Sequence, residues 1–351
     1  MEEKKHVRRV HYSGTHPKKY SEKYKELNPE KYADTIEHVI SKGSTPAGMH
    51  ISIMVNEILD ALDIKPGEQG LDATLGYGGH TRAMLEKLEH KGHMYATDVD
   101  PIESAKTRDR LAGLGFGEDI LTIKLMNFAN VDVLAKEVGT FDFVLADLGV
   151  SSMQIDNPER GFSYKLDGPL DLRLDPTSGV SAAERLAGMN EYEIAGMLEE
   201  NSDEPYADLI AKHIAQANRK HKSPATTFEL KAIIEEALTS AGIPKKDFAD
   251  TLKKTCARVF QALRIDVNNE FEVLYAFLDK LPHILSPGGR AAILTFHSGE
   301  DKLVKKSFRQ YEKEGLYSAI SEDAIRPTPA ECQRNSRAHS TKLRWAVKRG
   351  E

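Results

Sequence analysis

The residue types best suited to chemistry gather around a glycine-rich turn. Gly76, Gly78 and Gly79 follow a short apolar run that is expected to be a strand over residues 69–73. Glycine permits positive φ and lacks the Cβ that would keep a ligand away from the backbone. The helix expected over residues 81–88 would present unpaired N–H groups and a partial positive charge to an anionic ligand group. The spacing therefore predicts a nucleotide-like cofactor at the carboxyl end of a parallel strand.

Two acidic residues narrow the choice of cofactor. Asp98 lies 22 residues after Gly76, at the end of the next expected strand, where a carboxylate can accept hydrogen bonds from ribose hydroxyls. Asp72 precedes the turn and suits a ligand that bears an ammonium group. The turn lacks the third glycine of the dinucleotide fingerprint. S-adenosylmethionine, with an amine, a carboxylate and a ribose but no pyrophosphate, therefore fits better than NAD. The alternative is that both acids only cap helices.

Two further motifs follow expected strands. Asp147-Leu-Gly-Val-Ser-Ser152 offers a carboxylate and a glycine-containing turn to an amino group. His297-Ser-Gly-Glu-Asp301 has residue types that bind metals, but Ser298 followed by acids is also typical of a helix N-terminus. We therefore expect no metal ion at this second motif.

Alternating strands and helices must position these residues. The expected strands cover residues 69–73, 93–97, 120–125, 141–146 and 289–295, with weaker ones at 316–320 and 343–347. Such alternation predicts a parallel sheet with helices on both faces, the α/β Rossmann-like class. It fails after Ser151, where helices are expected over 182–198, 206–217, 227–241 and from 245 onward. We therefore predict three parts: a basic N-terminal extension (1–45), a discontinuous sheet domain (46–150 and 278–351) and an inserted helical domain (151–277).

Composition sets the broader class. The chain has 351 residues, 40% of them hydrophobic and 29% charged, which predicts a folded protein with a sizeable core. Cys256 and Cys332 stand alone, so no disulfide or zinc framework is expected and a cytoplasmic location is favoured. Neither a signal peptide nor an apolar run of about 20 residues is evident, which argues against a membrane segment.

Although the chain has a net charge of −6, both of its ends are basic. Residues 4–25 hold eight Lys and Arg against one Glu, and residues 326–349 hold seven against one Glu. Clustered cations next to tyrosines can meet nucleic-acid phosphates and bases. A solvated tail with no ligand is the alternative interpretation, and a helix is expected over residues 29–40.

Seven motifs in order resemble one known family. They are Asp72-Ala-Thr-Leu-Gly-Tyr-Gly-Gly-His80, Asp147-Leu-Gly-Val-Ser-Ser-Met-Gln154, Arg160-Gly-Phe-Ser163, Asp167-Gly-Pro-Leu-Asp-Leu-Arg173, Phe260-Gln-Ala-Leu-Arg-Ile265, Phe296-His-Ser-Gly-Glu-Asp301 and Asn335-Ser-Arg-Ala-His-Ser340. Together they resemble the bacterial small-subunit ribosomal RNA cytosine-N4 methyltransferases, the RsmH/MraW family, over residues 50–348.

The resemblance implies a methyltransferase-type Rossmann sheet, S-adenosylmethionine as cofactor, and 16S ribosomal RNA or the small ribosomal subunit as partner. The reaction it implies is direct in-line methylation of the exocyclic N4 amine of one cytidine. The implied cofactor contacts are Gly78, Gly79, His80, Asp98, Phe128, Asp147 and Gln154. Phe128 would pack against the adenine and Asp98 would hold the ribose. Asp147 is the candidate catalytic residue, either orienting the acceptor amine or serving only the cofactor.

Some features leave alternatives open. Ser52, Val259 and Gly299 depart from the family pattern, and the first 45 residues have no counterpart in its usual shorter members. A paralogue that methylates another RNA or DNA amino group, an NAD(P) oxidoreductase and a non-catalytic RNA-binding assembly factor are the rival functions. A homodimer is one open oligomeric state. The candidates for RNA phosphate contacts are Arg160, Arg173, Arg258, Arg264, Arg337 and Arg344, although acidic neighbours also suggest an internal ion pair for Arg173.

Overall fold

The computed structural model describes residues 52–350. The predicted extension 1–45 and the helix expected over 29–40 lie outside the described residues. Seven strands form one sheet. They are β1 (Gln69–Asp72), β2 (His93–Asp98), β3 (Leu121–Leu125), β4 (Phe141–Asp147), β5 (Leu285–Thr295), β6 (Tyr317–Ile320) and β7 (Lys342–Lys348). The predicted strands are therefore confirmed, with ends that differ by a few residues.

The strand order creates the edge at which ligands bind in this class of sheet. The order is β3-β2-β1-β4-β5-β7-β6, with β1 to β5 parallel and β7 antiparallel to both of its neighbours. The chain winds outward in one direction from β1 to β3 and in the other from β4. The junction of β1 and β4 is thus the topological switch point, outside whose carboxyl ends open α/β sheets hold their ligands.

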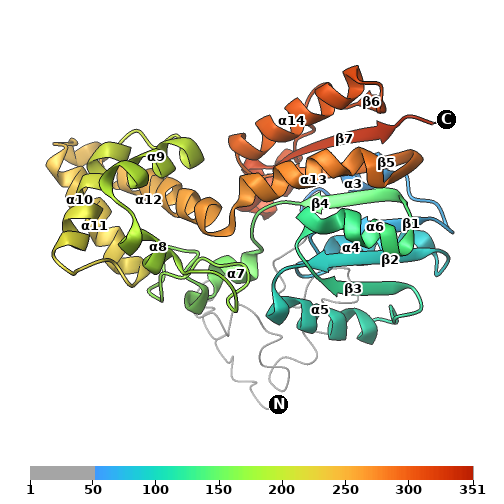
Figure 1. The fold of residues 1–351 in the computed structure, drawn as a ribbon, viewed down its shortest axis with the longest axis horizontal. Coiled ribbons are helices and arrows are strands. Elements are labelled where there is room, and N and C mark those ends of the chain that lie inside the picture. The colour runs from blue at the N-terminus through green and yellow to red at the C-terminus, as the bar shows by residue number, and fades with distance from the viewer. Residues whose placement is uncertain (1–51, 351) are drawn as a thin grey trace, which may run out of the picture. The chain divides into compact units, whose positions relative to one another are not determined.

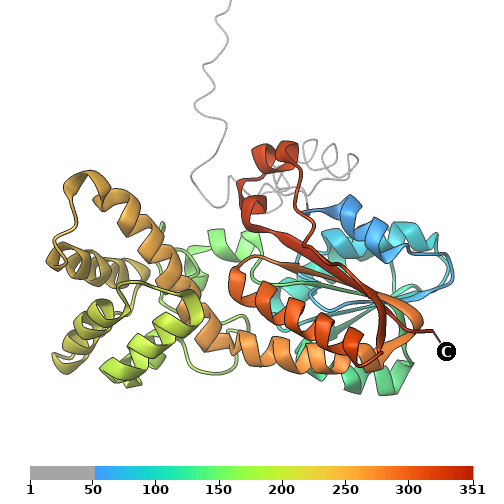
Figure 2. The same ribbon diagram turned by 90° about the horizontal axis from the view of Figure 1, so that it is seen from above.

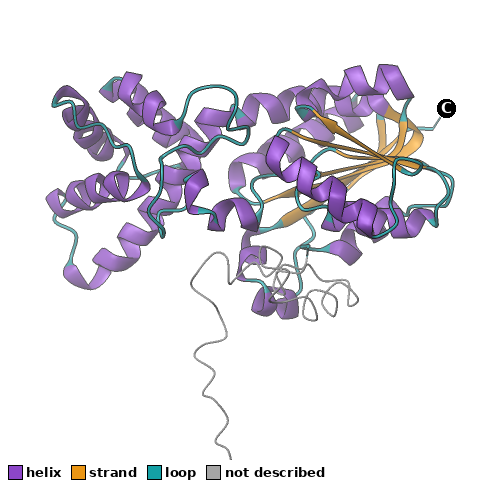
Figure 3. Cartoon of the chain, turned by 90° about the horizontal axis from the view of Figure 1, so that it is seen from below, coloured by secondary structure: helices purple, strands orange, loops and turns teal. Residues whose placement is uncertain are grey.

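Helices cover both faces of the sheet (Figure 3). The helices α3 (Val55–Leu62), α4 (Gly79–Leu88) and α5 (Pro101–Gly113) pack on one face, and α6 (Val131–Val138), α13 (Glu270–Ile284) and α14 (Ser298–Lys313) pack on the other. Strand β4 shows the alternation: Phe143 and Leu145 are buried against the first set, while Val144 and Ala146 are buried against the second. This is the predicted Rossmann-like α/β fold.

Several helices lie between β4 and β5 in the chain (Figure 1), and they have a hydrophobic core of their own. These helices are α8 (Ala182–Gly188), α9 (Glu191–Ser202), α10 (Ala207–Arg219), α11 (Thr227–Ser240) and α12 (Lys245–Asn268). Helix α12 leads through Asn269 into α13, whose Leu274 and Phe277 belong to the core of the sheet. The predicted domain limits stay a prediction; the limit at residue 277 falls inside α13.

Short elements complete the described chain, as seen from a second direction in Figure 2. They are η2 (Phe128–Asn130), α7 (Ser152–Asp156), η3 (Pro158–Arg160), α15 (Pro329–Arg334) and η4 (Ser336–Ser340). No helix within residues 52–350 is long and apolar enough to cross a membrane.

Two expectations about element limits were wrong. The helix expected over 182–198 is broken because Asn190 caps a new helix: its side chain accepts from the N–H groups of Tyr192 and Glu193, and the Glu193 side chain accepts from the Asn190 N–H. Such a reciprocal cap stabilises a helix start at that residue. Strand β5 begins at Leu285, before the expected start at residue 289, because Leu285 already pairs with Phe141 and the register shifts afterwards.

Candidate functional site

Asp98, at the end of β2, is held in place by the glycine turn. Its Oδ2 accepts a hydrogen bond of 2.7 Å from the Gly76 N–H, and its Oδ1 accepts one of 2.9 Å from the Asp100 N–H. Burial raises the pKa of Asp98 to about 6, against the lowering effect of these two N–H groups. The carboxylate is thus fixed beside the turn, where it can accept from ligand hydroxyls at neutral pH.

Asp72, at the end of β1, is buried below the turn. Its Oδ2 accepts from the Thr81 hydroxyl at 2.6 Å and its Oδ1 from the Thr74 N–H at 3.0 Å. Burial raises the pKa of Asp72, while the Thr81 hydroxyl, the nearby His80 charge and the Thr74 N–H oppose the rise. Its first function is therefore structural, because it ties the strand end to the first turn of α4.

His80 and Asp147 form a pair at the switch point. The His80 Nδ1 lies 3.3 Å from Asp147 Oδ2, and its Nε2 lies 2.9 Å from the carbonyl oxygen of Ile53. Burial alone would lower the pKa of His80, but the hydrogen bond and charge of Asp147 and the Ile53 carbonyl outweigh it, so the pKa is raised. Both residues were predicted from the sequence to contact the cofactor, and the structure brings their side chains into contact with each other.

The second carboxylate oxygen of Asp147 has no partner among the described residues. Asp147 Oδ1 is buried and receives no hydrogen bond within residues 52–350. The Asp147 N–H, in contrast, donates to the Thr74 hydroxyl at 2.6 Å, which joins β4 to the segment after β1. A buried acceptor without a donor carries a desolvation cost. A ligand N–H or ammonium group at this position would satisfy it.

The glycines of the turn have different roles. A Cβ at Gly78 would lie 2.7 Å from the Thr107 side chain, and one at Gly79 would lie 2.0 Å from the Ser52 hydroxyl. At Gly76, which has a φ of +48°, the nearest atom to a Cβ would be the Thr74 carbonyl oxygen at 3.8 Å. Gly78 and Gly79 thus let neighbouring elements pack closely, and Gly76 is the position with open space beside it. That Gly78 and Gly79 contact the cofactor stays a prediction.

A buried network around Asp100 was missed at the sequence level. Asp100 caps α5 through its Oδ1, and its Oδ2 accepts from Gln154 Nε2 at 2.9 Å and from Arg160 at 2.7 Å. The side-chain oxygen of Gln154 (Oε1) accepts in turn from the Ser151 N–H. The predicted cofactor contact Gln154 is therefore already engaged at both ends of its amide. The signal for the network was the Asp-Pro pair that starts a helix.

Phe128 lies in η2, directly after β3. Its ring meets the ring of Phe277 from α13 edge to face, with centroids 5.2 Å apart. The side chain is only partly buried against the core of the sheet. It is therefore available as an apolar surface at the same sheet edge, and its contact with an adenine stays a prediction.

The predicted RNA-contacting arginines are all paired with carboxylates of the chain. Arg160 and Arg344 are buried in ion pairs with Asp100 and Asp301, so the expectation that they meet RNA phosphates was wrong. The other pairs are Arg173–Asp171, Arg258–Glu204, Arg264–Glu270 and Arg337–Asp156. The internal ion pair of Arg173 was the alternative suggested by its acidic neighbours. These arginines thus join parts of the chain to one another.

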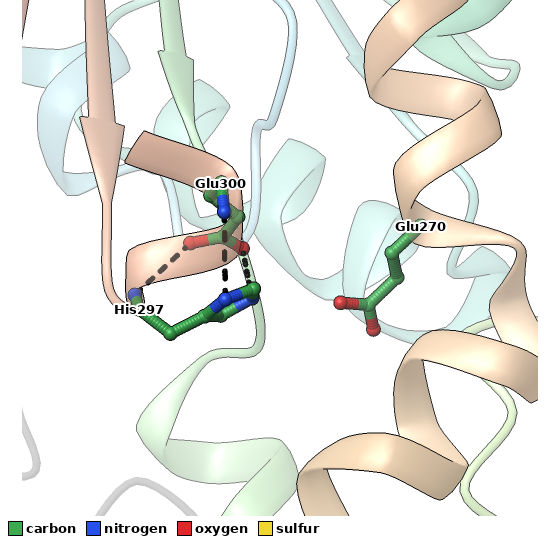
Figure 4. Close-up of side chains that lie close together, drawn as sticks. All are labelled: Glu270, His297 and Glu300. Atoms are coloured by element: carbon green, nitrogen blue, oxygen red, sulfur yellow. Dashed lines mark hydrogen bonds and ion pairs between the residues drawn. The ribbon is translucent and has the colours of Figure 1, made fainter. Parts of the chain in front are cut away.

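The motif after β5 forms a polar cluster with α13 (Figure 4). His297, not the expected Ser298, caps α14: the Glu300 N–H donates to His297 Nδ1 at 3.5 Å, and His297 Nε2 lies 3.2 Å from Glu300 Oε1. Glu270 lies opposite, close enough that the three side chains could share a metal ion.

The charges of this cluster are balanced by an arginine. The Arg264 guanidinium donates to both oxygens of Glu270, at 2.7 and 2.9 Å. Burial would raise the pKa of Glu300, but the hydrogen bond and charge of His297 and the charge of Arg264 lower it overall. Because Arg264 occupies the Glu270 carboxylate, the cluster serves as an ion-pair network between α12, α13 and α14. The expectation of no metal stays a prediction.

The site and the sheet together define a class of protein. The sheet order with its antiparallel β7, the glycine turn after β1, the acid at the end of β2 and the unsatisfied acid at the end of β4 define a Rossmann-like S-adenosylmethionine-dependent methyltransferase. The three carboxylates that residues 52–350 place at the ligand edge suit a cofactor with a sulfonium and an amine. The residues present therefore fit this cofactor.

The chain belongs to the MraW methylase family, whose model matches residues 47–349. A relative from Agathobacter rectalis, "Ribosomal RNA small subunit methyltransferase H 1", is 70% identical over 99% of both chains. A protein of the same name with the number 2, from Acholeplasma laidlawii, is 55% identical over 99% of this chain and 100% of its own. The similarly named relative from Thioalkalivibrio sulfidiphilus is 39% identical over 86% of this chain and 98% of its own.

Solved structures match less closely. The match to an S-adenosylmethionine-dependent O-methyltransferase from Thermotoga maritima covers 85% of this chain and 65% of that protein's chain, with 11% identity and a TM-score of 0.39. Membership of the family rests on the sequence matches alone. The family model begins at residue 47, which leaves the predicted basic extension outside it.

Proposed function

We propose that this protein transfers a methyl group from S-adenosylmethionine to the exocyclic N4 amine of one cytidine in the 16S RNA of the small ribosomal subunit. A relative that is 70% identical carries the name of a small-subunit ribosomal RNA methyltransferase, which supports the class of substrate. The observation that supports the acceptor group is the buried, unpartnered Oδ1 of Asp147 at the switch point. An amine donor is the kind of group that this oxygen lacks.

Asp147 would make the amine reactive. The lone pair of the cytosine N4 is conjugated with the ring, so the base must leave its stack and the nitrogen must be turned toward the methyl group. When bound, the cofactor supplies an electrophilic methyl on a sulfonium. Asp147, oriented by His80, accepts a hydrogen bond from the amine and holds its lone pair in line. Asp147 would then take the proton that the nitrogen loses as it receives the methyl group from the sulfonium.

The other predicted contacts would hold the cofactor. Asp98 accepts from the ribose hydroxyls, Phe128 packs against the adenine, and the backbone at Gly78, Gly79 and His80 approaches the amino-acid end. Gln154 lies on α7, and its hydrogen bond to Asp100 fixes the position of that helix. Support for this assignment comes from the position of these residues around one edge of the sheet, next to β1, β2, β3 and β4.

The helical part of the chain would recognise the RNA. We propose residues 151–277 as the substrate-recognition domain, because they carry their own hydrophobic core and follow directly on the loop that bears Asp147. The working partner would be the small ribosomal subunit in the cytoplasm. A homodimer stays a prediction that light scattering of the purified protein can test.

Mass mapping of ribosomal RNA tests the proposal. In cells that lack this protein, one N4-methylcytidine of 16S RNA should disappear, and expression of the full chain should restore it. If every N4-methylcytidine persists and a different modified nucleotide disappears, the chain is a paralogue with another target. If the RNA is unchanged but subunits assemble slowly, the chain is a non-catalytic assembly factor.

A further inference from the structure

A cavity of about 400 Å³ lies beside the polar cluster, between the helical part of the chain and the sheet. Its walls come from the end of α9, from α12, from the start of α13 and from the start of α14. This volume is within the range of small-ligand sites. Nothing in the proposed cofactor or acceptor site uses it.

Two aromatic rings line the cavity. Phe271 is partly buried, while Tyr275, one turn further along α13, is 56% exposed. A tyrosine this exposed contributes little to the core, so its loss should not unfold the protein. Nucleobases stack on such rings whatever their sequence, because every base has a π-face.

The polar lining of the cavity has two different parts. One part of the lining is the carboxyl end of α9, with its partial negative charge, and the lining includes the carboxylates of Glu200, Asp203 and Glu272. The amides of Asn201 and Gln261 each donate one hydrogen bond within the chain, to the Ala262 and Asn201 carbonyls, and an amide oxygen can accept from a ligand. This part therefore prefers a ligand with N–H donors.

A second part of the lining prefers an acceptor. It consists of the first turn of α14, whose N–H groups carry a partial positive charge, and of the exposed Lys302 on the same helix. A nucleotide matches both parts, since an exocyclic amine can donate to carboxylate and amide oxygens while the phosphate lies at the cationic part. A lysine or arginine side chain would satisfy only the first part.

We propose that this cavity binds one unstacked nucleotide of the RNA substrate, next to the nucleotide that is methylated. Its base carries an exocyclic amine and stacks on Tyr275 and Phe271. The inference rests on the proposed function in one respect, namely that the substrate is ribosomal RNA.

Contacts place the cavity one layer of side chains away from the reaction site. The ring of Phe271 lies 5.8 Å from that of His297, and His297 pairs with Glu300. On the far side of this cluster, a Cβ at Gly149 would lie 3.9 Å from the Arg264 guanidinium. Gly149 is two residues after Asp147, so a base in the cavity and a base at Asp147 would be neighbours along one strand.

Binding of purified small ribosomal subunits, taken from cells that lack this protein, tests the proposal. The full chain is labelled and titrated with subunits in saturating S-adenosylhomocysteine, so the result does not depend on which atom is methylated. Tyr275→Ala removes the stacking ring. Gly299→Leu fills the cavity, because a Cβ there already comes within 2.7 Å of the Phe271 ring. Tyr192→Ala is the matched control, since Tyr192 is 89% exposed on α9 and does not line the cavity.

The proposal expects Tyr275→Ala and Gly299→Leu each to raise the dissociation constant about tenfold, the usual scale for loss of one stacked base. Tyr192→Ala should bind like the wild type, and calorimetry should show unchanged S-adenosylhomocysteine affinity for all three variants. Ultraviolet crosslinking of the wild-type complex should then yield a nucleotide adduct on the tryptic peptide 265–280, which contains both aromatic residues.

Two results would overturn the inference. One is wild-type binding by both cavity variants. The other is absence of an RNA adduct on that peptide, including the case in which the peptide crosslinks to a ribosomal protein instead. Mass mapping of the RNA decides the proposed function separately, so that failure of one is distinguishable from failure of the other.

Discussion

His80 Nδ1 lies 3.3 Å from Asp147 Oδ2, while its Nε2 lies 2.9 Å from the Ile53 carbonyl oxygen. A carbonyl oxygen can only accept, so Nε2 carries a hydrogen; when Nδ1 is also protonated, the ring is an imidazolium facing a carboxylate. The pair connects the start of α4, the end of β4 and the segment before α3. It fixes one oxygen of Asp147 and leaves Oδ1 for a ligand.

His80→Phe should therefore lower catalysis more than cofactor affinity. The substitution keeps an aromatic ring but removes both contacts, so Asp147 loses the group that orients it. We expect kcat to fall at least about tenfold, equivalent to roughly 1.4 kcal/mol of transition-state stabilisation. Steady-state kinetics measure this, and calorimetry with S-adenosylhomocysteine is the control. A loss confined to cofactor affinity would show that His80 serves only the cofactor.

The same pair predicts a pH dependence of stability. The pKa of His80 is raised in the folded protein. A raised histidine pKa stabilises the fold fully below the unfolded value of about 6.5, and the contribution disappears as the pH rises through the folded value. The free energy of unfolding of the wild type should therefore exceed that of His80→Phe by more at pH 6 than at pH 9. Urea unfolding at both pH values measures the difference, and an equal difference would contradict a charged pair.

Cofactor affinity should fall in mild acid because of Asp98. Burial raises its pKa to about 6, so the carboxylate that accepts from ribose hydroxyls becomes protonated below that value. From pH 7.5 to pH 5, affinity for S-adenosylhomocysteine should decrease roughly tenfold, following the ionised fraction of one group. Asp98→Asn, whose side chain does not titrate, should bind weakly and without this slope. A flat wild-type profile would remove Asp98 from the ribose site.

Arg160 should matter for stability rather than for RNA affinity. Its guanidinium lies 2.7 Å from an Asp100 side chain that is 0% exposed. Arg160→Ala leaves a buried carboxylate without its counter-charge, which typically costs about 3–5 kcal/mol of unfolding free energy. Arg219→Ala is the matched control, because its ion pair with Glu191 spans 3.9 Å and its side chain is 65% exposed. Equal stability of the two variants would show that the Asp100 network does not hold the site.

Sequence patterns predicted those features that depend on local order. The apolar run from Phe141 to Ala146 predicted a central strand, and the position of Asp98 at the end of the next expected strand predicted its place beside the turn. Both follow from the geometry of parallel sheets, which brings the carboxyl ends of the strands to one edge. The helix break at Asn190 was also encoded locally, through a cap that the apolar pattern concealed.

The remaining features depend on partners that are distant in the sequence. The sequence around Arg160 does not distinguish an arginine that contacts RNA from one buried in an ion pair with Asp100, 60 residues away. The close approach of the Ser52 side chain to Gly79 could likewise not be predicted, because the two residues meet only in the folded chain. The contact between His80 and Asp147 likewise needs the folded sheet, because only the adjacency of β1 and β4 brings them together.

Single-turnover methyl transfer by Asp147→Asn shows whether Asp147 takes part in the reaction. Wild type and variant are mixed with saturating S-adenosylmethionine and small ribosomal subunits from cells that lack the protein. N4-methylcytidine formation is then followed by mass spectrometry, with S-adenosylhomocysteine affinity measured in parallel. If Asp147 orients the amine and takes its proton, the transfer rate should fall about 100-fold or more while cofactor affinity changes little. Transfer within about twofold of the wild type, with unchanged cofactor affinity, would contradict the account.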